Sequence, residues 1–262
     1  MNIRKKILIT GAKGGIGLES ALQLAARGHE VIATVHHESD IQIVQQAAGW
    51  RGVSLAVEKF DILNQDDRNT FTGRQIDVLI NNAAIGETGP LIEIPMDRVR
   101  RNFETNVFAT LELSQQFAKC MIQQGHGTVV IVGSLGGRLS MPFMGPYVMT
   151  KFALEAAIDA LRIELRPLGI KVSIIEPGAY ATGFNEKMHA KKYEWLKEDS
   201  AYHKHRKYIR FFEQSNFRLQ SSNTPRIAHQ VVRAAEARRP RARYVAPWWQ
   251  GAGVRLLRML GR

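Results

Sequence analysis

The sequence predicts one α/β domain built around a doubly wound parallel sheet with helices on both faces. Short apolar, β-branched runs alternate with segments of helical periodicity along most of the chain, and such alternation requires crossover connections between parallel strands. Runs such as Ile7-Leu8-Ile9 and Val129-Val130-Ile131-Val132 are apolar on both sides, as a sheet covered on both faces requires. No repeat and no linker rich in Pro, Gly or Ser divides the chain. We therefore expect residues 1–262 to form a single three-layer domain.

The elements can be placed in order along the chain. Apolar and β-branched runs suit a pleated, covered surface and predict strands. The expected strands are residues 6–10, 30–35, 53–60, 77–81, 128–133, 171–176 and 243–245. Apolar residues that recur every third or fourth position predict the helices between them. The expected helices are residues 15–26, 41–48, 65–72, 96–123, 146–165 and 225–237.

The composition argues against several classes of protein. Hydrophobic residues at 45% and charged residues at 23% are ordinary for a globular chain, which disfavours disorder, collagen-like repeats and coiled coils. The single Cys120 cannot form an internal disulfide or a thiolate zinc cluster. No apolar run approaches the roughly 18 residues of a spanning helix. The apolar stretch behind the basic N-terminus stops at Thr10-Gly11, too early for a secretory signal. A cytoplasmic protein is expected.

The net charge of +12 leaves several interpretations open. An anionic membrane, a nucleic acid or an anionic substrate could each explain it, and so could a surface charge without a partner. Two basic segments interrupt the alternation of strands and helices. Residues 183–222 are expected to form a substrate lid, because insertions of this length inside a domain are usually lids or binding loops. Between Lys187 and Arg218, its basic residues are interleaved with Tyr193, Trp195, Tyr202, Tyr208, Phe211, Phe212 and Phe217.

Aromatic residues interleaved with basic ones also suit a membrane surface or nucleic acid bases. Of these two alternatives to the lid, the membrane surface is favoured over nucleic acid. The second segment, residues 246–262, is a basic amphipathic tail with Trp248, Trp249, Leu256, Leu257, Met259 and Leu260 among its arginines. We expect the tail to pack on the core. Peripheral membrane contact through the lid or the tail is the alternative.

A glycine-rich loop follows the first strand directly and opens the first helix. Its residues are Gly11-Ala12-Lys13-Gly14-Gly15-Ile16-Gly17. Glycine lets the backbone turn sharply and approach a pyrophosphate closely. The N-terminus of the helix presents unpaired N–H groups and a positive dipole end to the phosphates. This position predicts a dinucleotide-phosphate site, although the spacing differs from G-x-G-x-x-G.

Five motifs in one order resemble the short-chain dehydrogenase/reductase family, whose fold is Rossmann-like. They are Thr10-Gly11-x-x-x-Gly15-Ile16-Gly17, Asp61, Asn81-Asn82-Ala83-Ala84, Ser134 with Tyr147-x-x-x-Lys151, and Pro177-Gly178 with Thr182. The likeness extends over about two thirds of the chain. One departure is Ala84, which replaces the last glycine of the family's Asn-Asn-Ala-Gly. Alanine is the smallest replacement, so we expect it to be tolerated.

The resemblance implies a set of residues around a nicotinamide dinucleotide. The implied cofactor contacts are Gly11, Lys13, Gly15, Ile16, Gly17, His36, Asp61, Ile62, Asn82, Ala83, Ala84, Tyr147, Lys151, Pro177, Gly178 and Thr182. The implied catalytic residues are Ser134, Tyr147, Lys151 and Asn106. In the family, the residue matching Asn106 holds a water that links the lysine to solvent. The resemblance alone also implies a homodimer or homotetramer.

The chemistry of the Tyr-Lys pair can also be derived from the residues. Tyr147 and Lys151 are four apart in a helical segment, so both project from one face. A phenol with a pKa near 10 is a poor base at neutral pH, but a nearby ammonium favours the phenolate. Tyr147 can then exchange a proton with a carbonyl or an alcohol, while Ser134 stabilises charge on the substrate oxygen. We expect an oxidoreductase that interconverts carbonyls and secondary alcohols. The alternative is a non-catalytic NADP redox sensor.

The end of the second strand indicates which nicotinamide cofactor binds. An acid there suits the ribose hydroxyl of NAD, and a basic residue suits the 2′-phosphate of NADP. Here the strand ends in His36-His37, with no carboxylate until Glu38, and Lys13 adds a cation. NADP(H) is therefore favoured over NAD(H). In the alternative interpretation both histidines are solvated and the site takes NAD.

No metal site is expected. The sequence contains His203-x-His205 but no His-Glu-x-x-His, and an ordinary basic loop explains the His203 pair better than metal binding. No motif in the lid indicates which carbonyl or alcohol is the substrate, or which direction the reaction prefers.

Overall fold

Seven parallel strands form the central sheet of the computed structural model, which describes residues 3–191 and 194–260. The strands are β1 (Lys6–Ile9), β2 (Glu30–Val35), β3 (Ala56–Lys59), β4 (Val78–Asn81), β5 (Gly127–Val132), β6 (Ile170–Pro177) and β7 (Arg243–Ala246). Their order across the sheet is β3-β2-β1-β4-β5-β6-β7. The order runs in opposite directions from β1 and from β4, so the loops after these strands diverge and open a crevice at the carboxyl edge of the sheet.

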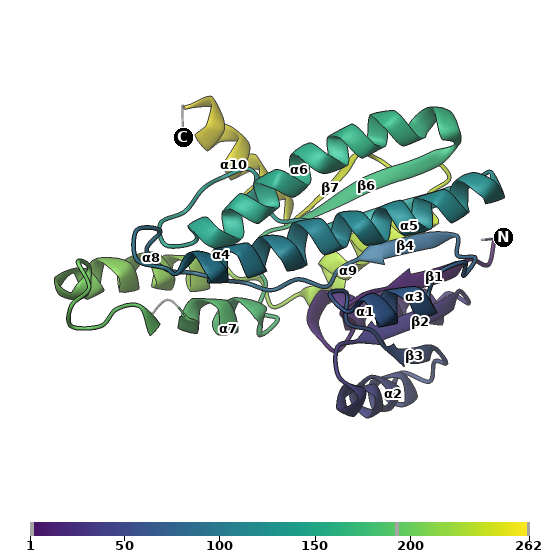
Figure 1. Cartoon of the computed structure of the whole chain (residues 1–262), viewed down its shortest axis with the longest axis horizontal. Coiled ribbons are helices and arrows are strands. Elements are labelled where there is room, and N and C mark those ends of the chain that lie inside the picture. The colour runs from purple at the N-terminus through teal and green to yellow at the C-terminus, as the bar shows by residue number, and fades with distance from the viewer. Residues whose placement is uncertain (1–2, 192–193, 261–262) are drawn as a thin grey trace.

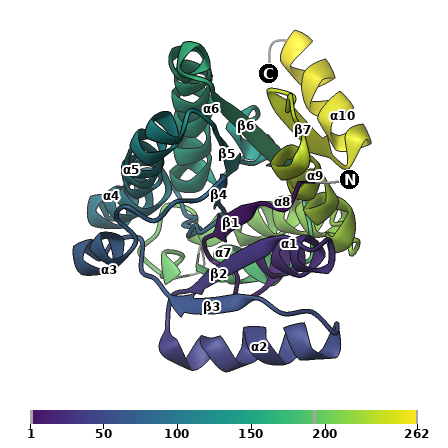
Figure 2. The same cartoon turned by 90° about the vertical axis from the view of Figure 1, so that its right-hand side faces the viewer.

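Helices cover both faces of the sheet (Figure 2). On one face, α1 (Gly15–Ala26), α2 (Ile41–Trp50) and α9 (Thr224–Glu236) pack on side chains such as Ile7 and Ile9. On the other, α5 (Ala109–Gln124) and α6 (Gly145–Leu165) pack on the intervening Leu8 and on Leu79, with α3 (Gln65–Thr70) near the edge. Successive strand residues point to opposite faces, which is why uniformly apolar strands suit two helical layers. The predicted doubly wound, Rossmann-like domain is confirmed.

The helix predicted at residues 96–123 is interrupted. It comprises α4 (Met96–Phe103), a π-helical turn at Glu104–Phe108 and then α5. The turn buries Asn106, whose side chain bonds to the backbone of Ile85 instead of facing solvent. A π turn adds one residue to a helical turn, and apolar periodicity alone cannot reveal such an addition.

The predicted strand at residues 53–60 is also shorter than expected, because only Ala56–Lys59 pair with β2 at the edge of the sheet.

The two basic segments contain helices that the apolar pattern did not predict. They are α7 (Phe184–Lys191), α8 (Arg206–Arg218) and α10 (Trp248–Met259). Figure 1 shows α7 and α8 at the end of the molecule opposite the N-terminus, while α10 projects from its upper side. Tyr193, Arg262 and the side chains of Phe212 and Phe217 lie outside the described part of the structure. In the described ranges, no helix combines the length and the apolarity needed to cross a bilayer.

Candidate active site

A cavity of about 650 Å³ lies at the carboxyl edge of the sheet and gathers most of the predicted site residues. Those that line it are Gly11, Gly15, Ile16, His36, Asp61, Ile62, Asn82, Ala83, Ala84, Ser134, Tyr147, Lys151, Pro177, Gly178 and Thr182. Lys13, Gly17 and Asn106 are not among the lining residues. The motifs therefore converge on one crevice, although they lie far apart along the chain.

The glycine loop is clamped to the end of β4 by Thr10 and Asn82. The side-chain nitrogen of Asn82 donates to the carbonyls of Thr10 and Gly11, each at 2.9 Å. Thr10 Oγ1 accepts from the backbone nitrogens of Asn82 and Ala83 at 3.0 Å. Gly11 has a φ of +68°, and a Cβ there would lie 2.8 Å from the Cα of Ala83. Asn82 thus shapes the loop through its amide. Sequence reasoning assigned no role to Thr10, although it occupies the first position of the motif.

The N-terminus of α1 is suited to an anionic group. The helix begins at Gly15, and it has neither a side-chain cap nor an acid in its first turn. Its first N–H groups therefore have no partner within the helix. A Cβ on Gly14 would meet nothing within 4 Å, whereas one on Gly15 would lie 3.1 Å from Thr182. Open space in front of unpaired N–H groups, with Thr182 alongside, fits the pyrophosphate of a dinucleotide.

Gly17 has a different role. It is buried, and a Cβ there would lie 2.5 Å from the Asn82 side chain and from the Gly11 carbonyl. This glycine allows the first turn of α1 to pack tightly on the loop, and it is not part of the cavity wall.

The sequence analysis expected Lys13 to contact the cofactor, but Lys13 is not among the lining residues and pairs with an acid instead. Its Nζ lies 2.7 Å from Oδ1 of Asp40, which is buried at the end of the short helix Glu38–Asp40 behind β2. His36 does line the cavity, with its Nε2 3.3 Å from Asp61 and its Nδ1 2.9 Å from Nε2 of His37. The pairing of Lys13 with Asp40 was missed, because no motif marks an acid at this spacing.

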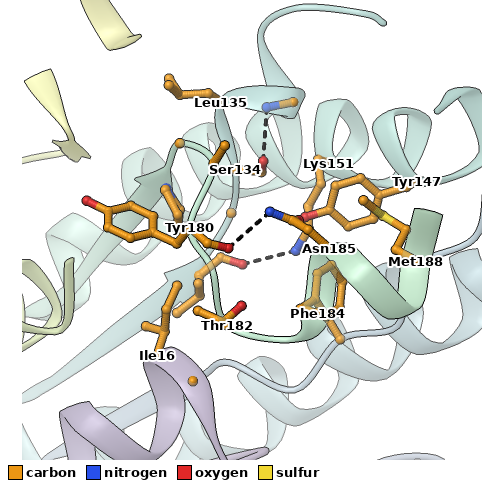
Figure 3. A pocket seen from close by; sticks show the side chains of 18 of the residues that line it. Ile16, Ser134, Leu135, Tyr147, Lys151, Tyr180, Thr182, Phe184, Asn185 and Met188 are labelled. Atoms are coloured by element: carbon orange, nitrogen blue, oxygen red, sulfur yellow. Dashed lines mark hydrogen bonds between the residues drawn. The ribbon is translucent and has the colours of Figure 1, made fainter. Parts of the chain in front are cut away.

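Ser134, Tyr147 and Lys151 meet on one side of the cavity (Figure 3). Ser134 follows β5, and its Oγ accepts from the backbone nitrogen of Gly136 at 3.0 Å. Tyr147 and Lys151 project from the first two turns of α6, and both are buried. Lys151 Nζ donates to the carbonyl of Val132 at 3.1 Å and lies 5.6 Å from the centre of the Tyr147 ring. The expected cluster of hydroxyl, phenol and amine is therefore assembled.

Burial dominates the electrostatics of this cluster. It raises the pKa of Tyr147 to about 12, although a hydrogen bond with Ser134 acts in the opposite direction. Burial also lowers the pKa of Lys151 to about 8, while the nearby Glu155 carboxylate opposes that change. The sequence analysis expected the ammonium to favour the phenolate, whereas in this structure desolvation has the largest effect and raises the pKa of Tyr147. Tyr147 therefore keeps its proton at neutral pH, as a general acid requires.

Asn106 lies behind this cluster. Its Oδ1 accepts from the Ile85 nitrogen at 2.9 Å, and its Nδ2 lies 2.8 Å from the Ile85 carbonyl and 3.1 Å from Thr150 Oγ1. Thr150 precedes Lys151 in α6, so the Asn106 amide connects the π turn and the loop after β4 to α6. The water-holding role implied by the family likeness stays a prediction.

The other half of the cavity is mainly apolar, and sequence reasoning did not identify its wall. Its apolar side chains are Leu135, Leu139, Met141, Met144, Phe184, Met188, Leu219, Trp249, Val254 and Leu257. Gln250 joins the contributing segments, because its Oε1 accepts from the Ala179 nitrogen at 2.8 Å and its Nε2 donates to the Leu219 carbonyl at 2.7 Å. The amphipathic pattern of the tail was the available signal for α10, but it did not show which surface α10 would cover.

In the described part of the chain, no three His, Cys, Asp or Glu side chains gather in a way that could hold an ion. His203 Nδ1 lies 3.0 Å from the carbonyl of Lys197.

Fold and site together define an oxidoreductase that uses a nicotinamide dinucleotide. Comparison with known proteins agrees: a family model described as short chain dehydrogenase matches residues 5–193. The chain belongs to the short-chain dehydrogenase/reductase family, whose members oxidise alcohols or reduce carbonyls with NAD(P).

Individual relatives support the same assignment. The chain is 37% identical over 186 residues to an uncharacterized oxidoreductase, YbbO, of Escherichia coli strain K12, covering 70% of this chain and 69% of that protein. It is 31% identical over 253 residues to human 17-beta-hydroxysteroid dehydrogenase type 1, covering 92% and 77%. Among solved structures, a short-chain dehydrogenase from Streptomyces avermitilis superposes with a TM-score of 0.80 at 26% identity, covering 99% and 94%.

Proposed function

We propose that this protein is an NADP(H)-dependent oxidoreductase that interconverts an apolar carbonyl compound and its secondary alcohol, with Tyr147 as general acid and base. The observation that carries the proposal is the position of Tyr147. It is buried between Ser134 and Lys151, where the glycine-loop half of the cavity meets the apolar half. A proton donor at that junction can reach a substrate oxygen that comes from the apolar side.

The chain's own residues supply the proton and orient the substrate, while the bound dinucleotide supplies or accepts the hydride. Tyr147 Oη donates its proton to the carbonyl oxygen in reduction and takes it from the hydroxyl in oxidation. The Gly136 nitrogen holds Ser134 Oγ, and the Ser134 hydroxyl hydrogen-bonds to Tyr147. Both hydroxyls can therefore bond to one substrate oxygen. The Lys151 ammonium, charged below about pH 8, stabilises the phenolate left after donation.

The preference for NADP(H) is supported by the charges around the end of β2. His36 lies in the cavity wall with His37 beside it. Of the acids in this region, Asp40 pairs with Lys13 and Asp61 lies 3.3 Å from His36. A 2′-phosphate there would meet two imidazoles, with these two carboxylates already facing basic groups. Comparison of kcat/KM for NADPH and NADH tests this, and a strong preference for NADH would contradict it.

The apolar character of the substrate is supported by the cavity wall. Leucines, methionines and aromatic residues form most of the substrate side, and methionine side chains adapt to ligands of irregular shape. Among the residues that the structure describes, Asp61 alone brings a carboxylate to the wall, and it lies near His36. The likeness to 17-beta-hydroxysteroid dehydrogenase type 1 agrees with a bulky, mostly apolar alcohol.

Residues 183–222 act as the substrate lid in this proposal. Phe184 and Met188 of α7 pack with Tyr147, with ring centres of Phe184 and Tyr147 5.8 Å apart. The loop after β4 holds α7 down, since Thr88 Oγ1 donates to the Met188 carbonyl at 2.6 Å. Closure of this segment over the substrate would exclude water from Tyr147.

We also propose that the protein self-associates. The exposed apolar side chains of Phe108, Met149 and Phe152, on the π turn and α6, support this. Light scattering on the purified protein tests it.

A spectrophotometric assay of NADPH consumption tests the activity. We expect turnover with bulky apolar ketones and aldehydes and much less with charged ketones such as 2-oxo acids. Tight NADPH binding without turnover of any carbonyl, together with binding of a protein partner that depends on the redox state, would instead support a sensor. The intact trio of Ser134, Tyr147 and Lys151 argues against that alternative, because a sensor has no need of a proton donor.

A further inference from the structure

The helix α10 has two contrasting faces. One faces the protein, where Gly251 and Val254 are buried and Leu257 lines the cavity. Gln250 fixes the orientation of the helix through its bonds to the Ala179 nitrogen and the Leu219 carbonyl. The rotation of α10 about its own axis is therefore determined, and its other side is turned outward.

The outward face is apolar. Trp248, Leu256, Met259 and Leu260 are exposed by 69%, 55%, 77% and 71%, and Trp249 is also largely exposed. Positions 248, 252, 256 and 259 repeat every three or four residues, so they form one stripe along the helix. A contiguous apolar stripe of this kind marks a contact surface, whereas single exposed apolar residues need no explanation.

Charge indicates the kind of partner. The last acidic residue of the sequence is Glu236, and residues 237–262 contain seven arginines and no Asp or Glu. Arg255 and Arg258 are exposed on α10 itself. A second copy bound through this face would bring the same arginines together across a two-fold axis. An anionic lipid surface complements them, and tryptophan favours the boundary between lipid and water.

We propose that the outward face of α10 docks on an anionic phospholipid bilayer. Trp248, Leu256 and Met259 enter the headgroup region, while Arg255 and Arg258 contact anionic headgroups. The entrance of the cavity lies next to this face, because Trp249 and Leu219 both line the cavity and remain exposed. An apolar substrate could then pass from the lipid into the cavity without crossing water. The docking itself depends on α10 alone and does not require the proposed activity.

Co-sedimentation of the full-length protein with vesicles tests the docking. We expect the protein to pellet with phosphatidylcholine vesicles that contain about 30% phosphatidylserine, and about tenfold less with pure phosphatidylcholine. The double variant Trp248→Ser/Met259→Ser should lose about tenfold in vesicle affinity. Its turnover of a water-soluble ketone should not change, since neither residue lines the cavity. Replacing Arg255 by Gln should weaken binding to the anionic vesicles about fivefold.

The control is Trp50→Ser, because Trp50 is an exposed tryptophan on a different helix, at the end of α2. It should bind vesicles like the unchanged protein. The proposal is overturned if the unchanged protein stays in the supernatant at low salt, or if the Trp50 variant loses as much binding as the α10 variant. It is also overturned if the α10 variant keeps its vesicle affinity but dissociates from an oligomer to a monomer in light scattering, which would identify the partner as a second copy.

Discussion

Removing the Tyr147 hydroxyl should abolish turnover while leaving the fold and cofactor binding intact. Phenylalanine keeps the ring, so the packing on Phe184 and Met188 is unchanged. Stability should change by about 1 kcal/mol or less, because one hydrogen bond with Ser134 is lost. That corresponds to a Tm shift of about 2–4 °C. The reaction loses its proton donor, which costs roughly 10²–10⁴ in kcat.

The assay is NADPH oxidation with saturating ketone, accompanied by calorimetric measurement of NADPH binding. The structure offers a matched control in Tyr180→Phe. Tyr180 is also buried and lines the same cavity, but its hydroxyl has no hydrogen-bond partner among the described residues and lies away from Lys151. Tyr180→Phe should retain turnover within about threefold. If Tyr147→Phe keeps more than about a tenth of the activity, or if both variants lose the same amount, Tyr147 is not the proton donor.

Three further predictions concern charge. Replacing Lys13 by Met leaves Asp40 unpaired near the end of β2, so the kcat/KM ratio of NADPH to NADH should fall about tenfold; an unchanged ratio would remove Lys13 and Asp40 from cofactor selection. Carbonyl reduction should be independent of pH near neutrality and should decline above about pH 8, as Lys151 loses its proton; a rate that keeps rising to pH 10 would contradict this. Burial and the neighbouring Glu176 raise the pKa of Glu155 from 4.5 to about 7. The folded state therefore binds the proton of the Glu155 carboxyl group more tightly than the unfolded state does. As a result, the protein loses stability as the pH rises from about 4.5 to about 7. Glu155→Gln does not undergo this loss, so the Tm of the variant relative to that of the unchanged protein should increase between pH 5 and pH 8. A Tm difference that stays constant over this range would refute the raised pKa of Glu155.

The arrangement of the core and the cofactor loop could be predicted because both depend on local patterns. Uniformly apolar runs such as Ile7-Leu8-Ile9 determine strands covered on both sides. Gly11 and Gly15 adopt positive φ angles that other residues rarely reach. The glycines in the sequence therefore indicate where the backbone makes the tight turn of the predicted phosphate site. Tyr147 and Lys151 are separated by one helical turn, and their proximity follows from helix geometry alone.

Other features depend on contacts between distant segments, and no local pattern encodes them. Lys13 was predicted to face the cofactor, but its ion pair with Asp40 forms only when the short helix Glu38–Asp40, which follows β2, meets the glycine loop. The π turn around Asn106 depends on the backbone of Ile85. Whether the pKa of Tyr147 rises or falls depends on how completely the neighbouring elements exclude water from its hydroxyl.

The amino-acid sequence by itself determined the individual strands, the glycine loop and the Tyr-Lys pair. Each of these features arises from residues within one strand, turn or helix. Only the tertiary structure decided that α10 closes the apolar half of the cavity with one face and turns the other outward. An amphipathic pattern shows that a helix has two faces. Which face is buried depends on the surface it meets, and here that surface is built from Ala179 and Leu219, whose backbone groups bind Gln250.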